Sequence, residues 1–221
     1  MIKLHGVEIR YPDDAFHLRI PGLKIDTREK VAIIGPSGSG KTTLMNAVAG
    51  ILLPEKGEIR FDEIVVNRLS DTARRKFRLS HIGFVFQDFG LIEYLSTLDN
   101  ILHPYRINDA LVLAAAVRNR AYDLADSLAV GGLLHKFPCT LSQGEKQRVA
   151  ICRALLTQPH LILADEATGN LDPDNKLRIL ELLFAAVDKQ GATLVAVTHD
   201  HALLPYFDRV IRMDELSGTN N

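Results

Sequence analysis

The chain has 221 residues, of which 47% are hydrophobic and 24% are charged, and its formal net charge is −1. This composition is ordinary for a globular protein with one sizeable core, and the near-zero charge argues against nucleic acid as a partner. The longest unbroken apolar run, residues 111–117, is far shorter than the about 20 residues that cross a bilayer. Residues 1–5 also lack the apolar segment of a signal peptide.

Short apolar segments predict the strands of an α/β fold. In chain order they are residues 2–9, 31–34, 82–86, 161–164, 193–197 and 210–213. Several are continuous apolar runs, which are typical of parallel strands covered on both faces. A helical pattern over Pro173–Val187 follows Asp172, a suitable N-cap, and it carries an apolar stripe of Leu177, Leu180, Phe184 and Val187. The alternation of strands and helices predicts a doubly wound core.

A phosphate-binding loop is predicted directly after the second of these strands. The motif G-x-x-x-x-G-K-[ST] is formed by Gly35, Pro36, Ser37, Gly38, Ser39, Gly40, Lys41 and Thr42, and Thr43 continues into a helical segment. In this strand–loop–helix context the backbone N–H groups and the helix N-terminus bind phosphate oxygens. Lys41 is expected to reach the β- and γ-phosphates, and the Thr42 hydroxyl to bind Mg²⁺. The sequence therefore predicts binding of a nucleoside triphosphate.

The middle of the chain has a different character. The basic run Arg74–Arg78 predicts a solvated helix face, with contact to lipid or nucleic-acid phosphates as the alternative. Residues 91–136 show little strand character, and Asn108 with Asp109 indicates the start of a helix. The expected apolar stripe is Leu111, Ala114, Ala115, Tyr122, Ala125 and Leu128. We predict one domain, residues 1–221, with a core of about residues 1–88 and 139–221 and a helical subdomain of about residues 89–138.

Two cysteines, Cys139 and Cys152, are too few and too far apart for a disulfide framework or a zinc site. We expect both to be buried small residues in a reducing compartment.

Two further motifs carry chemistry. Ser142 and Glu145 form S-x-x-E before a helical pattern, which predicts a capping box, although a hydroxyl at a helix start can equally belong to an anion site. The apolar strand at residues 161–164 ends in Asp165 and Glu166, at the sheet edge where ligands bind. Asp165 is expected to hold Mg²⁺ or its water, and Glu166 to act as general base on a water molecule. Solvated acids at an ordinary strand end are the alternative.

With these motifs the whole chain resembles the ATP-binding cassette (ABC) family of transporter ATPases. Residues 141–145 match the family signature, so Ser142, Gln143, Gly144 and Glu145 are expected at the nucleotide. Further matches to family motifs are Gln87 (Q-loop, catalytic and Mg²⁺-binding), His199 (switch histidine), Asn170–Asp172 (D-loop, with Asp172 at the nucleotide) and Tyr11 (adenine stacking). For Tyr11, plain packing remains the alternative. His201 is expected to be an ordinary surface histidine.

The resemblance implies a P-loop NTPase (RecA-like) core with a mostly parallel sheet, an N-terminal antiparallel β region and an inserted helical subdomain. It also implies a head-to-tail dimer, a homodimer or a pair with a related ATPase, that holds two ATP molecules. Each ATP would lie between Lys41 of one subunit and Ser142 of the other, and hydrolysis would drive the assembly. The expected partner is a separately encoded membrane-spanning permease, which places the chain on the cytoplasmic, inner face of the cell membrane.

The run Glu166–Asp172 is similar to E-P-T-G-N-L-D of the lipoprotein-release, macrolide-efflux and cell-division ATPases. In this run Ala167 stands where the usual residue is proline. In the signature, Gln143 stands where glycine is commoner, and Glu145 stands where glutamine is frequent. A mechanical regulator of the cell-division type is therefore an alternative to a transporter. A chromosome-repair ATPase would need long coiled coils that the sequence lacks. Intact Lys41, Glu166 and His199 argue against a degenerate, non-hydrolysing subunit.

Overall fold

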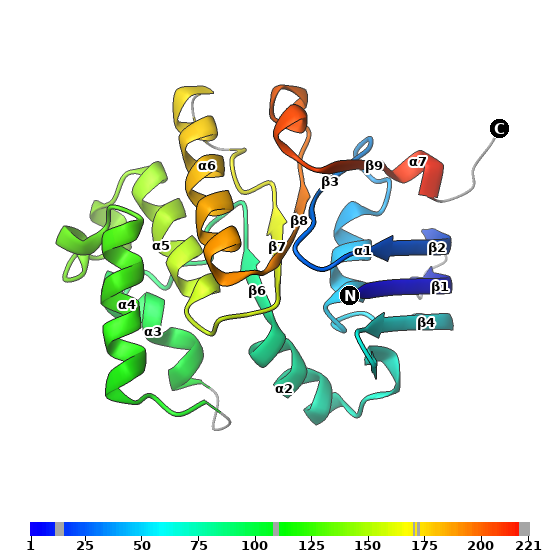
Figure 1. The fold of residues 1–221 in the computed structure, drawn as a ribbon, viewed down its shortest axis with the longest axis horizontal. Helices are drawn as coiled ribbons and strands as arrows, with labels where there is room; N and C mark the ends of the chain where they lie inside the picture. Colours follow the sequence, from blue (N-terminus) through cyan, green and yellow to red (C-terminus); the bar gives the residue numbers. More distant parts are fainter. Residues whose placement is uncertain (12–15, 108–110, 170, 172, 217–221) are drawn as a thin grey trace. The chain divides into compact units, whose positions relative to one another are not determined.

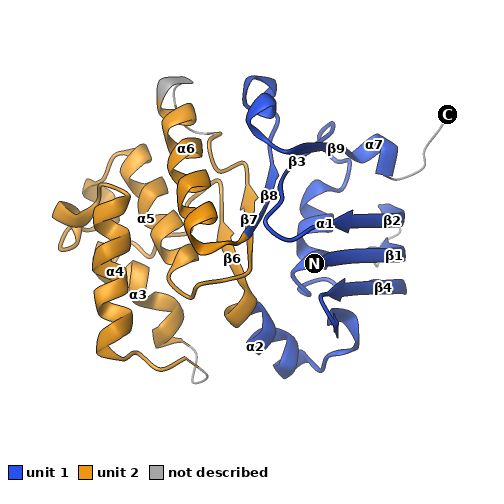
Figure 2. Cartoon of the chain, viewed as in Figure 1, with its two compact units in different colours: residues 1–78, 193–221 blue, residues 79–192 orange. Residues whose placement is uncertain are grey.

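A computed structural model describes residues 1–11, 16–107, 111–169, 171 and 173–216. The chain forms two compact units, which we call unit 1 (residues 1–78 and 193–221) and unit 2 (residues 79–192) (Figure 2). Figure 1 gives the order of the elements along the chain. Helix α2 (Asp71–His81) carries the chain from unit 1 into unit 2.

Unit 1 contains an antiparallel sheet of strands β1 (Ile2–Arg10), β2 (His17–Ile25), β4 (Lys56–Phe61) and β5 (Ile64–Val65), in the order β2-β1-β4-β5. The register of β1 with β2 runs from Ile2 opposite Ile25 to Arg10 opposite His17. Buried and exposed residues largely alternate along β1 and β2, so only one face of the sheet is apolar. The predicted strand at residues 2–9 is confirmed, but β2, β4 and β5 were not predicted from the sequence.

Unit 1 also contains parallel strands in the order β8 (Thr193–Val197), β3 (Lys30–Ile34) and β9 (Arg209–Arg212). All five residues of β8 and the last four of β3 are buried, as the sequence predicts for parallel strands. Helix α1 (Lys41–Val48) follows β3, the 3-10 helix η4 (His201–Tyr206) follows β8, and α7 (Met213–Leu216) follows β9. The predicted strand at residues 210–213 ends at Arg212, because Met213 already begins α7.

Unit 2 joins two parallel strands, β6 (Ile82–Val85) and β7 (Leu161–Asp165), to four helices. The helices are α3 (Thr97–Arg106), α4 (Ala115–Ser127), α5 (Gln143–Leu155) and α6 (Pro173–Gln190), with short 3-10 helices η2 (Gly131–Leu133) and η3 (Pro138–Thr140). Strand β6 approaches α5 so closely that a Cβ on Gly83 would collide with the Ala154 carbonyl oxygen.

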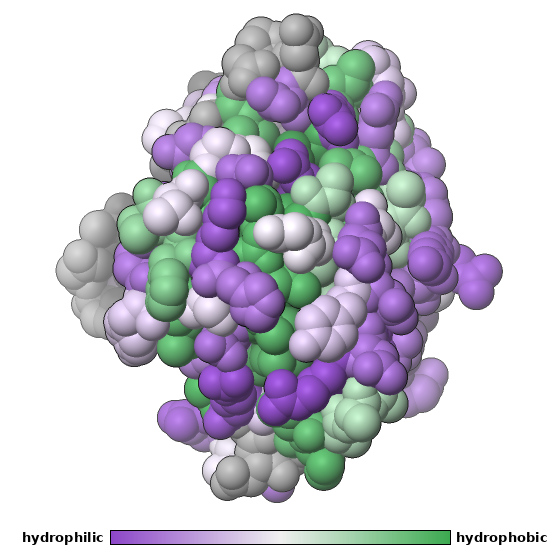
Figure 3. Space-filling view, turned by 90° about the vertical axis from the view of Figure 1, so that its left-hand side faces the viewer, coloured by the Kyte–Doolittle hydropathy of each residue, from purple (hydrophilic) through white to green (hydrophobic). Residues whose placement is uncertain are grey.

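On the side drawn in Figure 3, hydrophobic surface is bordered by hydrophilic side chains.

These elements confirm the predicted α/β class with its N-terminal antiparallel region. Helices α3 and α4 lie within residues 89–138, where helices are predicted. The division of the chain into a core and an inserted subdomain stays a prediction. Among the described residues, none of the helices has both the length and the apolar character needed to span a membrane.

The predicted apolar stripe of residues 111–128 is wrong in part. Helix α4 begins only at Ala115, and Ala115 and Tyr122 are exposed. The buried positions of the helix are Val117, Ala121 and Ala125, which share one face at a spacing of four residues. The predicted stripe failed because Leu111 and Ala114 precede the helix and so do not share its face. The predicted helix start at Asn108 and Asp109 lies outside the described residues.

The two cysteines differ. Cys152 is buried in α5, where burial raises the pKa of its thiol. Cys139 is exposed, so the expectation that it is buried is wrong. The reason is its place in the short η3, in which Pro138 is the buried residue.

The basic run on α2 is only partly solvated. Lys76 is exposed, and exposed Arg75 pairs with Asp71 at 2.8 Å. In contrast, Nη1 of Arg74 donates to the Leu69 carbonyl at 2.7 Å, and Nη1 of Arg78 donates to the Ala49 carbonyl at 3.3 Å, at the end of α1. Two of the four cations of this run therefore stabilise backbone carbonyls of unit 1.

Candidate nucleotide-binding site

The loop between β3 and α1 has the backbone geometry of a phosphate cradle. Gly38 and Gly40 have φ of 78° and 94°, in the left-handed region that favours glycine. Gly40 is the N-cap of α1 and offers no side-chain hydrogen bond to the first turn. The N–H groups of that turn point out of the helix start, where an anion is the natural acceptor.

Lys41 spans this loop. Its Nζ donates hydrogen bonds to the Gly35 and Pro36 carbonyl oxygens, both at 2.8 Å. The ammonium therefore lies over the loop that the sequence assigns to phosphate. Of the other predicted loop residues, Pro36, Ser37 and Thr42 are exposed, and Ser39 and Thr43 are half-buried and buried, respectively.

Two aromatic rings lie beside the start of α1. The Tyr11 hydroxyl is 3.4 Å from Thr43 Oγ1, and the Tyr11 and Phe16 rings meet edge to face with centroids 6.3 Å apart. A Cβ on Gly40 would stand 2.8 Å from Phe16 Cζ. The structure thus places Tyr11 at the phosphate loop and adds Phe16, which the sequence analysis missed. Its signal was a second aromatic residue five positions after Tyr11.

His199 belongs to the same edge of unit 1. Strand β8 runs parallel to β3 with Val197 opposite Ile33, and the Thr198 N–H donates to the Ile33 carbonyl at 3.2 Å. His199 follows and is exposed, while Asp200 caps η4 by accepting the Ala202 N–H at 3.1 Å. The carboxyl ends of β3 and β8 therefore present the phosphate loop and His199 together. His201 is exposed, as expected for a surface histidine.

Unit 2 places both predicted acids at the carboxyl end of β7, which pairs with β6 so that Val85 lies opposite Ala164. Asp165 is the last residue of β7, and Glu166 follows with φ of 46°, which is uncommon outside glycine. A Cβ on Gly169 would stand 3.4 Å from Gln87 Nε2 and 3.6 Å from Glu166 Oε2. The amide of Gln87 and the carboxylate of Glu166 therefore converge on one turn of unit 2.

The predicted capping box at the start of α5 is confirmed. Ser142 Oγ accepts the Glu145 N–H at 3.3 Å, and Glu145 Oε2 accepts the Ser142 N–H at 2.7 Å and the Ser142 hydroxyl at 2.8 Å. These bonds, the backbone one first, hold the pKa of Glu145 below its ordinary value. Gln143 is exposed and Gly144 half-buried beside them. The capping reading and the anion-site reading remain compatible, because the hydroxyl lies at the surface.

Arg153 is a positioning residue that the sequence analysis missed. From α5 its guanidinium donates to the Phe89 carbonyl at 2.6 Å and to the Gly90 carbonyl, just after Gln87. Burial lowers the pKa of Arg153. Arg153 therefore links α5, the helix of the signature residues, to the segment after Gln87.

Two D-loop positions, Asn170 and Asp172, lie outside the described residues.

The donor chemistry suits magnesium held mainly by phosphates. The described residues contain no group of three or more His, Cys, Asp or Glu side chains that would hold a metal by themselves. Thr42, Gln87 and Asp165 carry hard oxygen donors, and Mg²⁺ is typically bound by one or two carboxylates together with substrate phosphates.

Comparison with protein families gives a match to the ABC transporter family over residues 18–169. The lipoprotein-releasing system ATP-binding protein LolD 2 of Caulobacter vibrioides is 37% identical over 97% of this chain and 95% of its own length. The macrolide export ATP-binding/permease protein MacB of Rhodopirellula baltica is 41% identical over 97% of this chain.

The chain spans only part of some relatives. It covers 32% of that MacB and 64% of an uncharacterised ABC transporter ATP-binding protein of Mycobacterium tuberculosis, to which it is 38% identical over 96% of this chain. MacB, whose name joins ATP-binding and permease functions, is therefore matched over about a third of its length.

Solved structures agree with the fold. A dimeric, post-hydrolysis structure of the ATP-binding cassette MJ0796 with ADP and phosphate has a TM-score of 0.84 and 35% identity, covering 96% of this chain and 94% of that one. A second dimeric structure of MJ0796, described as a bacterial ABC transporter cassette, has a TM-score of 0.84 and 36% identity over the same shares. The chain belongs to the ABC transporter family and is one of its ATP-hydrolysing, nucleotide-binding cassettes.

Proposed function

We propose that this chain hydrolyses ATP to drive a separately encoded membrane permease. The name of the similar LolD 2, an ATP-binding protein of a lipoprotein-releasing system, supports this proposal. The observation that supports the proposal best is the start of α1, where the N-cap residue Gly40 has no side chain to cap the helix and Lys41 Nζ lies 2.8 Å from two loop carbonyls. A triphosphate would take over both the backbone N–H groups and the lysine.

Phosphate binding is assigned to unit 1. Lys41 moves its hydrogen bonds from the Gly35 and Pro36 carbonyls to the β- and γ-phosphates, and Tyr11 or Phe16 supports the adenine. Thr42, Gln87 and Asp165 are the residues that would hold Mg²⁺, and the ion would supply positive charge against the phosphate oxygens.

The base is assigned to Glu166, whose carboxylate lies at the same turn as the amide of Gln87. Glu166 accepts a proton from the attacking water, while Gln87 helps to orient that water. His199 holds the γ-phosphate from the end of β8.

We further propose that two copies pair head to tail around two ATP molecules. The names of two similar solved structures describe dimers of a cassette, which supports this arrangement. Ser142 of one copy would then bind the γ-phosphate held by Lys41 of the other, by turning its hydroxyl away from Glu145. Asp172 is assigned to the same interface.

The membrane partner would be bound mainly through the helical segment of residues 89–138, placing the chain on the cytoplasmic face of the membrane. Purification from solubilised membranes tests this part, because a co-purifying permease supports transport and a protein without a cargo route supports a mechanical regulator.

ATP turnover of Glu166→Gln tests the catalytic assignment. The variant should hydrolyse ATP about 10²–10⁴-fold more slowly, the usual contribution of a general base, while it still binds ATP. Glu181→Gln makes the same chemical change at an exposed position of α6 and should hydrolyse ATP at the normal rate. Undiminished turnover of Glu166→Gln would reject Glu166 as the base.

A further inference from the structure

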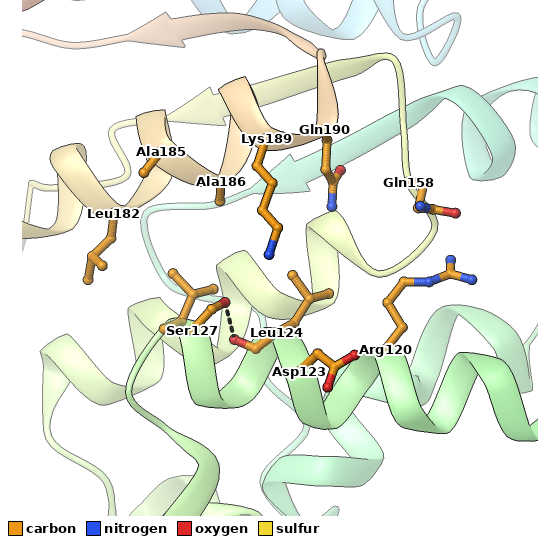
Figure 4. Close-up of a pocket in the computed structure, with 11 residues that line it drawn as sticks. Arg120, Asp123, Leu124, Ser127, Gln158, Leu182, Ala185, Ala186, Lys189 and Gln190 are labelled. Atoms are coloured by element: carbon orange, nitrogen blue, oxygen red, sulfur yellow. Dashed lines mark hydrogen bonds between the residues drawn. The ribbon is translucent and has the colours of Figure 1, made fainter.

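Unit 2 contains a hollow that none of the nucleotide-binding residues lines. It lies between α4 and α6, beside the end of α5, and has a volume of about 470 Å³ (Figure 4). Its apolar wall is formed by Leu124 and Leu128 on one side and Leu182, Ala185 and Ala186 on the other. This volume and this mainly apolar lining are usual for small-molecule sites, which span about 300–1,000 Å³.

Hydrogen bonds to the end of α5 hold the hollow in shape. From α4, Arg120 Nη1 donates to the Leu156 carbonyl at 3.1 Å, and from α6, Gln190 Nε2 donates to the Leu155 carbonyl at 3.1 Å. Both helices are thus fixed to adjacent carbonyls of one segment. A ligand would enter a formed site and would not have to order it.

The charge at the hollow is unbalanced toward cations. Arg120 and Lys189 line it together with a single acid, Asp123. In Figure 4 the Lys189 ammonium points from α6 toward α4, above the apolar side chain of Leu124. Lys189 forms no hydrogen bond or ion pair with any residue in the described part of the chain. An ammonium group beside an apolar surface is suited to a ligand that is mostly apolar and carries one anionic group.

We propose that this hollow binds a small, soluble amphipathic anion, with an apolar body on Leu124, Leu128 and Leu182. Its single carboxylate, phosphate or sulfonate pairs with Lys189, and the guanidinium of Arg120 adds a second cation at the rim. None of the residues that line the hollow is assigned to ATP binding or hydrolysis.

A tryptophan reporter tests the proposal. The chain has no tryptophan, so Ala185→Trp, at an exposed position lining the hollow, gives one signal at the site. Monomeric decanoate, added without nucleotide, should shift the emission to shorter wavelength and saturate. Decanol should bind more weakly and decyltrimethylammonium weakest, and calorimetry on the unaltered chain should give the same order.

The charge variants make the test specific. Lys189→Glu should weaken decanoate binding about tenfold, as the loss of one charge-assisted hydrogen bond predicts. Arg118→Glu reverses a charge at an exposed position of α4 outside the hollow and should leave the affinity within about twofold. Three results would overturn the proposal. They are equal affinity for the cationic and anionic probes, an equal loss of decanoate affinity in the Lys189→Glu and Arg118→Glu variants, and no saturable decanoate binding. Binding to phosphatidylglycerol vesicles but not to decanoate would also overturn it, because the ligand would then be a membrane surface.

Discussion

Helices α1 and α5 begin in opposite ways. The first turn of α1 follows Gly40, which offers no side-chain cap, and Lys41, the first residue of the helix, is bonded to loop carbonyls. The first turn of α5 follows Ser142, and a complete capping box with Glu145 satisfies its backbone there. Both helix starts belong to sequence motifs that we assign to the same nucleotide.

The difference indicates a division of labour. A helix start without a side-chain cap gains most from an anion, so α1 is suited to hold the triphosphate firmly in each copy. A helix start with its own cap is stable without the ligand, so α5 is suited to a contact that forms and breaks in each cycle.

Of the substitutions at the starts of α1 and α5, Lys41→Ala should have the largest effect. Removal of the ammonium from the phosphate loop should reduce ATP turnover about 10²–10³-fold, comparable to the loss of one preorganised donor to a developing charge. The measurement is phosphate release at saturating ATP. Lys76→Ala, at an exposed position of α2, is the control and should retain normal turnover. A Lys41→Ala variant as active as that control would remove α1 from the account.

Substitution of Gly38 and Gly40 by alanine should show how much of the stability loss comes from steric contact and how much from backbone strain. Both positions have positive φ, which costs about 1–2 kcal/mol for an L-residue. A Cβ on Gly40 also stands 2.8 Å from Phe16 Cζ, whereas a Cβ on Gly38 meets nothing within 4 Å. Urea unfolding should therefore show a larger loss of stability for Gly40→Ala than for Gly38→Ala. Adding Phe16→Leu to each variant should reduce the difference in stability between Gly40→Ala and Gly38→Ala. If that difference stays the same, Phe16 does not pack against Gly40.

Ser142→Ala should lower the free energy of unfolding by about 1 kcal/mol, the usual value of an N-cap. Urea unfolding monitored by circular dichroism measures it. Ser127→Ala is a matched change in an exposed serine whose hydroxyl donates to the Leu124 carbonyl at 2.9 Å, and it should cost less. Equal losses would mean that the capping box contributes no special stability.

The smallest effect concerns pH. Since folding lowers the pKa of Glu145, its ionised form stabilises the native state above the unfolded pKa of about 4.3. That contribution is lost as the pH falls through the lower, folded value. Glu145→Gln should thus be less stable than the parent at pH 7, and the difference in melting temperature should shrink between pH 5 and pH 3. A difference that stays constant with pH would contradict the ionised capping box.

The sequence indicated where those parts of the fold and of the candidate site lie that are contiguous in the chain, and the roles of the site residues stay predictions. The phosphate loop, the Ser142–Glu145 box and the Asp165–Glu166 pair are each a few residues long, and strands β3, β7 and β8 are continuous apolar runs. Strand β2 was missed because it alternates apolar residues with charged residues, proline and glycine.

Roles set by distant contacts were beyond the sequence. Phe16 matters because its ring meets Gly40, and Arg153 because it reaches carbonyls 63 and 64 positions away in the chain. Likewise, the exposure of Cys139 follows from the short helix that holds it, which no local pattern indicated.

The central claim is that α1 of one copy and α5 of another hold one ATP between them. Analytical ultracentrifugation of Glu166→Gln, with and without ATP, tests it most directly, because slow hydrolysis leaves the nucleotide in place. We expect a monomer without ATP, a dimer at saturating ATP, and loss of that dimer when Ser142→Arg is added. A protein that stays monomeric at saturating ATP would contradict the shared site. So would a dimer that persists when Ser142→Arg is added.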